Sequence, residues 1–137
     1  MAAGDGSDRE GFQVRRILIV DDEEPIVFAL RRFLVSRGYE VIAAREREEA
    51  EALILLGAFD AMIADLRLTR AHGAEGLELL SCIRRFTPRT LTILLTAYGT
   101  PEVEREARAR GADVFLLKPQ PLPELADLLD ELLARTA

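Results

Sequence analysis

Residues 17–24 read ILIVDDEE, and this stretch decides the fold class. The aliphatic run ILIV is continuous rather than alternating, which is typical of a strand buried on both faces in a parallel sheet. The acidic run DDEE follows without a break, so the strand ends in concentrated negative charge. We therefore expect a central parallel strand whose carboxyl end carries the chemistry of the protein.

Similar runs recur along the chain, each separated from the next by a segment with the period of an amphipathic helix. The later runs are YEVIAA (39–44), DAMIAD (60–65), LTILLTA (91–97) and VFLLK (114–118), and helices are expected to begin near Pro101 and Pro121. Strands joined through crossover helices pair in parallel, with helices on both faces of the sheet. The predicted fold is α/β, a flavodoxin-like doubly wound sheet of five strands in the order 2-1-3-4-5.

The composition fits one folded domain and disfavours a nucleic-acid or membrane role. The chain has 137 residues, 49% of them hydrophobic, and we assign residues 1–13 to a flexible tail and 14–137 to the domain. A net charge of −6 disfavours direct contact with nucleic acid, which is bound mainly by clustered Lys and Arg. Because the sequence has neither a run of about 20 apolar residues nor an export signal, we expect a cytoplasmic protein.

Three other features have structural interpretations. The leucine stripe of the last helix, which includes Leu125, Leu129 and Leu133, predicts core packing more strongly than docking of a partner helix. Cys82 lies in an apolar segment and is expected to be a small buried residue rather than a reactive thiol. His72 is given no role, because a metal site would need more nitrogen or sulfur ligands.

Polar residues collect at the carboxyl ends of the predicted strands, where ligands bind in open α/β sheets. Asp21 and Asp22 follow the first strand, Asp65 ends the third, Thr96 ends the fourth and Lys118 ends the fifth. In the predicted strand order the first and third strands are neighbours about 4.8 Å apart, so the three aspartates should lie close together. The predicted site thus combines carboxylates, a hydroxyl and an ammonium group.

Such a cluster of carboxylates needs either raised pKa values or a bound cation, and a hard divalent cation is the natural solution, because two unit charges about 4 Å apart repel by about 4 kcal/mol at an effective dielectric constant near 20. Oxygen ligands without a nearby histidine or cysteine suit Mg²⁺, which leaves coordination positions open for phosphate. With Lys118 and Thr96 facing the oxygens of a phosphoryl group, Asp65 is predicted to be the nucleophile of a phosphoryl transfer. Taken singly, each residue is also explained as a helix cap, a turn or a solvated loop residue.

Four short motifs resemble the response-regulator receiver family, and the resemblance covers nearly the whole domain. They are VDDEE (20–24), IAD (63–65), LLTA (94–97) and LLKP (116–119). The resemblance implies that Mg²⁺ is bound by Asp22, Asp65 and the backbone carbonyl of Arg67. Asp21 would complete the acidic pocket and act mostly through water.

The resemblance also implies a role for each of the other site residues. Asp65 would accept the phosphoryl group, and Lys118 would pair with it. Thr96 would act as the switch hydroxyl, together with Phe115 as an aromatic switch residue that turns inward. A plain core residue is the other interpretation of Phe115. The Lys118-Pro119 peptide would be cis.

Two features depart from the family pattern. The loop LRLTRAHGAEG (66–76) has Thr69 where proline is common, and it is longer than is usual. Arg67 and Tyr98 each lie two residues beyond a site residue, at positions that resemble those lying over the phosphoryl group and limiting the access of water. We predict that these two side chains set the lifetime of the phosphorylated state.

The function that the resemblance implies is that of a phospho-accepting receiver in a two-component signal transduction system. A histidine kinase or phosphotransfer protein would phosphorylate Asp65, and the protein would catalyse only its own phosphorylation and dephosphorylation. The surface of the fourth helix, fifth strand and fifth helix would then bind a second copy, as a homodimer, or an output protein. The sequence does not distinguish a stand-alone receiver from part of a longer regulator.

Two other functions fit parts of the pattern. An Mg²⁺-dependent phosphohydrolase would also use an aspartate nucleophile on a similar sheet, but its DxD pattern after the first strand is missing. A flavin-binding module would need a phosphate loop rich in Ser, Thr and Gly, whereas VDDEE (20–24) would repel a flavin phosphate. Stoichiometric labelling from acetyl phosphate would favour the receiver, and turnover of a phosphomonoester would favour the hydrolase.

Overall fold

The structure of this chain is a computed structural model that describes residues 14–65, 75–97 and 99–135. The predicted tail of residues 1–13 and the loop residues 66–74 lie outside the described residues, as do 98 and 136–137. The predictions made above for Arg67, Thr69, His72 and Tyr98 therefore concern residues that the structure does not describe.

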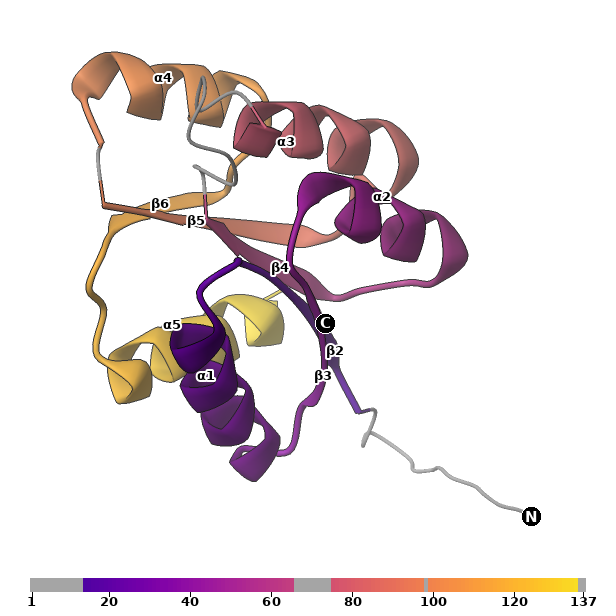
Figure 1. The fold of residues 1–137 in the computed structure, drawn as a ribbon, viewed down its shortest axis with the longest axis vertical. Helices are drawn as coiled ribbons and strands as arrows, with labels where there is room; N and C mark the ends of the chain where they lie inside the picture. The colour runs from indigo at the N-terminus through magenta and orange to yellow at the C-terminus, as the bar shows by residue number, and fades with distance from the viewer. Residues whose placement is uncertain (1–13, 66–74, 98, 136–137) are drawn as a thin grey trace.

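Strands and helices alternate along the described chain, as the sequence predicts (Figure 1). The strands are β2 (Arg16–Val20), β3 (Glu40–Ala44), β4 (Ala61–Asp65), β5 (Leu91–Thr96) and β6 (Val114–Leu117). The helices are α1 (Glu24–Ser36), α2 (Arg47–Leu56), α3 (Glu75–Phe86), α4 (Pro101–Ala109) and α5 (Leu122–Arg135). Every strand begins and ends within one residue of its predicted run.

The strands form one parallel sheet in the order β3-β2-β4-β5-β6. Numbered along the chain, this is the order 2-1-3-4-5, so the fold prediction is confirmed. In the register of the sheet, Val20 pairs with Ala64, Asp65 with Leu95, and Thr96 with Leu117. These pairings bring the last residues of four strands to the same edge of the sheet.

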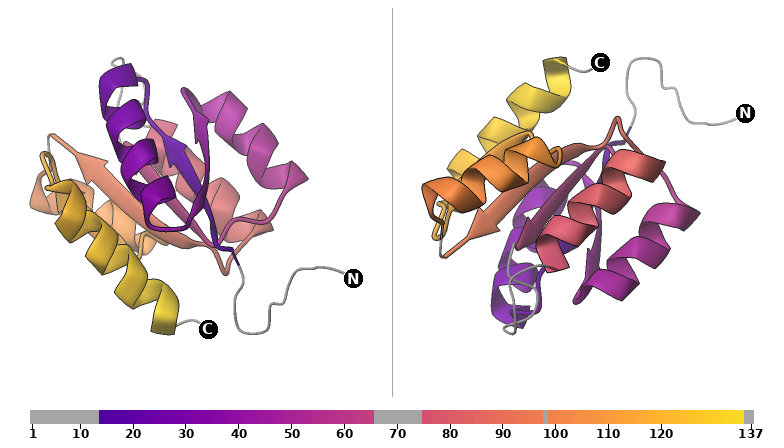
Figure 2. Two further views of the ribbon diagram at one scale, coloured as in Figure 1. Left: turned by 90° about the horizontal axis from the view of Figure 1, so that it is seen from below. Right: turned by 90° about the horizontal axis from the view of Figure 1, so that it is seen from above.

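Helices cover both faces of the sheet (Figure 2), and a hydrophobic cluster lies on each face. Leu18 and Val20 pack with residues of α2, α3 and α4, whereas Ile17 and Ile19 pack with residues of α1 and α5. All four side chains are at most 1% exposed, because successive residues of a strand point to opposite faces and helices cover both. This arrangement explains why the first aliphatic run is continuous.

The leucine stripe of α5 packs in the core, which confirms the interpretation favoured from the sequence. Leu125, Leu129 and Leu133 are buried, and Leu122 and Leu132 pack against the same cluster. Among the described helices, none combines the length and the apolar character needed to cross a membrane.

Local sequence signals fix a helix end at each edge of the sheet. The Thr100 hydroxyl accepts the Val103 N–H at 3.1 Å and caps α4, and Pro101 opens the first turn. The cap of α4 is thus Thr100, and Thr96 stays at the end of its strand. After α1, Gly38 has a φ of 98°, which lets the chain turn back into β3 without steric strain.

Candidate functional site

The carboxyl ends of β2, β4, β5 and β6 meet to form the candidate site. Asp21 follows β2, Asp65 ends β4, Thr96 ends β5, and Lys118 follows β6. Asp21, Asp22 and Asp65 each place a carboxylate oxygen within 4.8 Å of the others. The chain topology therefore brings together the three aspartates that the sequence pattern singled out.

The Lys118 side chain connects the acidic groups of the site. Its Nζ donates to Asp21 Oδ2 at 3.1 Å, to Glu23 Oε1 at 3.2 Å and to Asp65 Oδ2 at 3.3 Å. The side chains of Asp21, Asp65 and Lys118 are only 6%, 12% and 15% exposed, so water screens these charge-assisted bonds incompletely. Lys118 was expected to face the oxygens of a phosphoryl group on Asp65. It also reaches across to the acidic residues that follow β2.

These contacts keep the Lys118 ammonium group protonated. Burial by itself would lower the pKa of Lys118, because desolvation disfavours the charged ammonium group. The hydrogen bond and charge of Asp21, the charge of Asp65 and the hydrogen bond of Glu23 outweigh burial, so the pKa lies above its ordinary value of 10.5. Lys118 is therefore a cation at neutral pH. The stability that it contributes is present below pH 10.5 and is lost only as the pH rises above that value.

A titration of Lys118 should detect this shift. Lys118 is the only lysine of the chain, so protein labelled with ¹³C at lysine Cε gives one side-chain resonance to follow against pH. In metal-free protein, we expect a midpoint above 10.5, and a lower midpoint in Asp21→Asn. Circular dichroism at each pH would show that the protein stays folded. A midpoint at or below the ordinary value in folded wild-type protein would contradict the contacts of Lys118.

Glu23 is a site residue that the sequence pattern did not identify. It is the N-cap residue of α1, yet its side chain makes no capping hydrogen bond. Its carboxylate instead pairs with Lys118, and its backbone N–H donates to Asp21 Oδ1 at 2.9 Å. The acidic run DDEE (21–24) was the available signal, but for Glu23 it indicates only the start of a helix.

Thr96 and Phe115 lie on the neighbouring strands β5 and β6. Thr96 is fully buried, and Phe115 is partly buried against the core cluster that includes α2, α3 and α4. A Cβ at Gly99 would lie 3.0 Å from Phe115 Cε2 and 2.7 Å from Leu117 Cδ2, so glycine lets the chain after β5 pass close over β6. The structure thus places Phe115 next to the segment that follows Thr96.

The donor set fits a hard divalent cation. Asp21, Asp22, Asp65 and Glu23 supply four carboxylates against one ammonium group, which leaves three formal negative charges. The candidate ligand atoms are carboxylate oxygens, the type that Mg²⁺ and Ca²⁺ prefer. An ion with oxygens at about 2.1 Å holds adjacent ligands about 3 Å apart. The candidate oxygens lie within 4.8 Å of one another, so side-chain rotation would have to bring the more distant ones closer.

Two smaller predictions can also be compared with the structure. The Lys118-Pro119 peptide is cis, in agreement with the family resemblance. Cys82 packs against the core but is only partly buried, so the expectation of a small buried side chain is met in part. Burial raises the pKa of the Cys82 thiol, and the charge of Glu51 adds to this shift, which disfavours the reactive thiolate.

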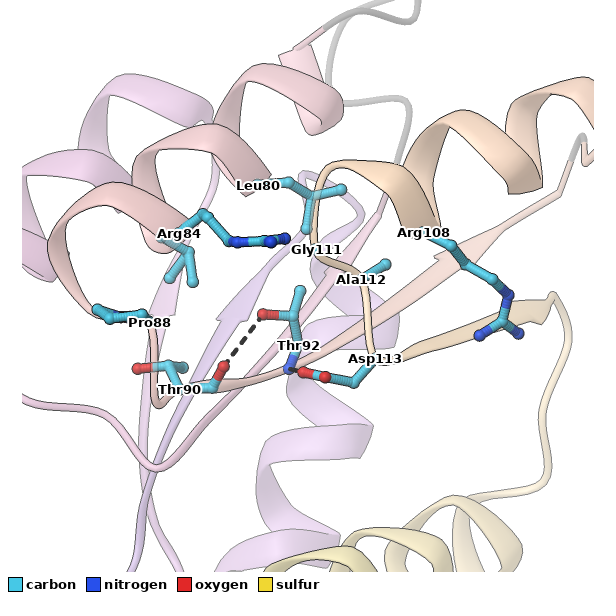
Figure 3. Close-up of a pocket in the computed structure, with 10 residues that line it drawn as sticks. Leu80, Arg84, Pro88, Thr90, Thr92, Arg108, Gly111, Ala112 and Asp113 are labelled. Carbon is cyan, nitrogen blue, oxygen red and sulfur yellow. Dashed lines mark hydrogen bonds between the residues drawn. The ribbon is translucent and has the colours of Figure 1, made fainter.

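A cavity of about 340 Å³ lies at the other end of β5, away from the candidate site (Figure 3). Arg84, Gly111, Thr92 and Asp113 are among the residues that line it. The Asp113 carboxylate accepts the Thr92 N–H at 2.8 Å, and the Asp113 N–H donates to the Thr92 carbonyl at 2.9 Å. These bonds join β5 to the turn before β6, so Asp113 has a structural role in this cavity.

Comparison with known proteins places the chain in a family. Residues 17–130 match the family described as response regulator receiver domain. The response regulator receiver protein Anae109_2439 of Anaeromyxobacter sp. (strain Fw109-5) is 35% identical over 115 residues, which cover 84% of this chain and 47% of that protein. The chain spans less than half the length of the first curated relatives that it matches.

Solved structures agree with this match. A CheY-like receiver domain protein from Methanospirillum hungatei JF-1 has a TM-score of 0.84 and 30% identity, and the match covers 90% of this chain and 97% of that one. A Burkholderia pseudomallei response regulator, solved with a phosphorylated aspartic acid, a calcium ion and citrate, has a TM-score of 0.74 and 27% identity. That match covers 85% of this chain and 71% of the other. With the sheet order and the acidic cluster at its carboxyl edge, these matches show that the chain belongs to the response regulator receiver domain family.

Proposed function

We propose that this chain is a phospho-accepting receiver in which Asp65 takes a phosphoryl group from a phosphohistidine donor. One observation carries the proposal. A carboxylate oxygen of Asp65 lies within 4.8 Å of oxygens of two other carboxylates, and its Oδ2 lies 3.3 Å from the Lys118 Nζ. A partly buried acidic residue with both a cation site and a fixed positive charge beside it suits transfer of a phosphoryl group. The phosphorylated aspartic acid of the Burkholderia pseudomallei relative supports the same chemistry here.

In the proposed reaction, a carboxylate oxygen of Asp65 attacks the phosphorus of phosphohistidine. The new O–P bond forms as the P–N bond breaks, and the electron pair of that bond stays on the imidazole nitrogen. Lys118 stabilises the negative charge of the phosphoryl oxygens, and the Thr96 hydroxyl can donate to one of them. Bound Mg²⁺, held by Asp22, Asp65 and the Arg67 backbone carbonyl with Asp21 acting through water, would neutralise the charge that three carboxylates present to the donor.

The proposed donor is a sensor histidine kinase or a phosphotransfer protein that docks over the acidic cluster. A groove of about 320 Å³ lies next to the site, between α1 and α5, and its lining includes Ile26, Leu30, Lys118 and Leu122. Its mostly aliphatic side chains would receive an apolar residue of the donor, while the reacting histidine meets Asp65. We propose that this encounter takes place in the cytoplasm and that residues 14–137 form the receiver unit.

We propose that phosphorylation is read through the surface of α4, β6 and α5. The Thr96 hydroxyl would move toward the phosphoryl group, and Phe115, which lies beside Gly99 and the segment after Thr96, would turn inward to fill the space. Leu117, exposed at the end of β6, belongs to this surface. A second copy of the chain or an output protein is the proposed binding partner.

The proposed catalysis is limited to the chain's own phosphorylation and dephosphorylation. We propose that Arg67 and Tyr98, which lie outside the described residues, set the rate of the second step. Replacement of both with small residues should change the rate of dephosphorylation, and an unchanged rate would remove this assignment.

A labelling experiment tests the proposed function against a phosphohydrolase. With Mg²⁺ and acetyl phosphate, the intact chain should gain one phosphoryl group, measured by mass spectrometry, and a phosphomonoester such as p-nitrophenyl phosphate should not turn over. Chelation of the metal should abolish labelling, because the carboxylates then repel the anionic donor. Repeated turnover of the phosphomonoester without a stable label would contradict the receiver function.

A further inference from the structure

Glu23 points into the site in a way that helix formation does not require. At the N-cap position a side-chain oxygen commonly accepts a backbone N–H of the first helical turn. The Glu23 side chain makes no such bond, and its Oε1 lies 3.2 Å from the Nζ of Lys118, which is 95 residues away in the sequence. The Glu23 carboxylate therefore pairs with Lys118 of the site and does not cap its own helix.

In the described structure, all three N–H donors of the Lys118 ammonium group have acceptors. An ammonium group carries three N–H donors, and Lys118 Nζ has three carboxylate acceptors, on Asp21, Glu23 and Asp65, at 3.1–3.3 Å. A phosphoryl group on Asp65 brings new oxygens that need a positive partner. For one of them to bind Lys118, an existing bond of Lys118 has to be given up.

The three acceptors differ in how easily they can be exchanged. The Asp21 carboxylate is only 6% exposed and also accepts the Glu23 N–H, so loss of its cation would leave a buried charge. Asp65 carries the phosphoryl group itself. The Glu23 side chain is 55% exposed, so water can replace Lys118 there at little cost. Of the two partners that keep their carboxylates on phosphorylation, Glu23 is therefore the one that Lys118 can leave more easily.

We propose that Glu23 is a positioning residue that competes with the phosphoryl group for Lys118. In the unphosphorylated protein it holds the ammonium group, and on phosphorylation the N–H···O bond to Glu23 is exchanged for one to a phosphoryl oxygen while the proton stays on Lys118. The competition slows phosphorylation and lowers the phosphorylated fraction at a given donor concentration. This inference rests on the proposed function of Asp65.

Rates of labelling in matched variants test the competition. With Mg²⁺ and acetyl phosphate, Glu23→Gln should be phosphorylated about 1.5- to 5-fold faster than the wild type, the range for loss of a largely exposed ion pair. Glu24→Gln is the control, because it removes the same charge from the next residue, whose carboxylate pairs with Arg45 at 3.1 Å. Glu23→Asp keeps the charge but is one methylene shorter, so it should also be faster than the wild type. Equal rates for Glu23→Gln and Glu24→Gln, or a wild-type rate for Glu23→Asp, would overturn the inference.

The single lysine provides a second readout that does not depend on phosphorylation. In metal-free protein labelled at lysine Cε and Nζ, Glu23→Gln should shift the Lys118 resonances, and Glu24→Gln should leave them in place. With Mg²⁺ and beryllofluoride, a mimic of the phosphoryl group, the resonances of the wild type and Glu23→Gln should converge, because Lys118 has then left Glu23. A difference that persists with beryllofluoride bound would overturn the exchange.

The two readouts separate failure of this inference from failure of the proposed function. If the wild-type protein is labelled but Glu23→Gln and Glu24→Gln are phosphorylated at the same rate, the role of Glu23 is overturned and the receiver function is left intact. Wild-type protein that cannot be labelled would overturn the receiver function, and the competition with it. The metal-free resonances would still show whether Glu23 holds Lys118.

Discussion

Asp65→Asn should reduce phosphorylation by acetyl phosphate by at least about 1,000-fold, since loss of the proposed nucleophile removes the step itself and not only its acceleration. Asparagine keeps the shape of the side chain and an acceptor for Lys118, so the sheet and the neighbouring contacts should persist. The variant should also lose one negative charge from the cluster, which reduces its affinity for a divalent cation. Intact-mass spectrometry at fixed times after mixing measures the label.

Asp60→Asn is the matched control for this variant, because Asp60 immediately precedes the same strand, at its opposite end. The Asp60 Oδ2 accepts the Arg16 N–H at 2.8 Å, and an asparagine oxygen can accept that bond as well. The control should be labelled at a rate close to that of the wild type. A label of comparable size on Asp65→Asn would show that another residue accepts the phosphoryl group.

Lys118→Met should slow phosphorylation by about 10²- to 10³-fold, the usual cost of removing one group that stabilises charge in a transition state. Methionine has a similar length and keeps the apolar stem, so the change removes mainly the ammonium group and its three bonds to Asp21, Glu23 and Asp65. The phosphoryl oxygens then develop charge without their protein cation. Stopped reactions analysed by mass spectrometry give the rate, and circular dichroism checks the fold.

Lys118→Arg separates the effect of charge from that of position. Arginine keeps the charge, but its planar fork is larger than an ammonium group and does not fit a point that three carboxylates approach within 3.3 Å. We expect this variant to recover only part of the rate lost in Lys118→Met. A rate for Lys118→Met within a few-fold of the wild type would contradict the role of the ammonium group.

The sheet could be predicted from the sequence because its two determinants are local. Continuous aliphatic runs such as Ile17–Val20 mark strands covered on both faces, and the helical segments between the runs require parallel crossovers. Strand order then followed from the common doubly wound arrangement, and it placed Asp21, Asp65 and Lys118 at one edge. The structure agrees with this order, and its register brings the strand ends to one edge.

The direction of individual side chains could not be predicted in the same way. Glu23 occupies an ordinary position at a helix start. The Glu23 carboxylate belongs to the site only because it pairs with Lys118, which follows the edge strand β6. The reach of Lys118 toward Asp21 depends equally on a contact between residues 97 positions apart in the chain. Helix and strand periodicity contains no information about such long-range pairs.

The central claim is that four strand ends build one phosphoryl-transfer site. A structure with Mg²⁺ and beryllofluoride bound tests this claim most directly. We predict beryllium bonded to a carboxylate oxygen of Asp65, a fluorine within hydrogen-bonding distance of Lys118 Nζ, and the cation on the carboxylates of Asp22 and Asp65. Beryllofluoride bound elsewhere, or a cation that leaves these two carboxylates without contact, would contradict the account.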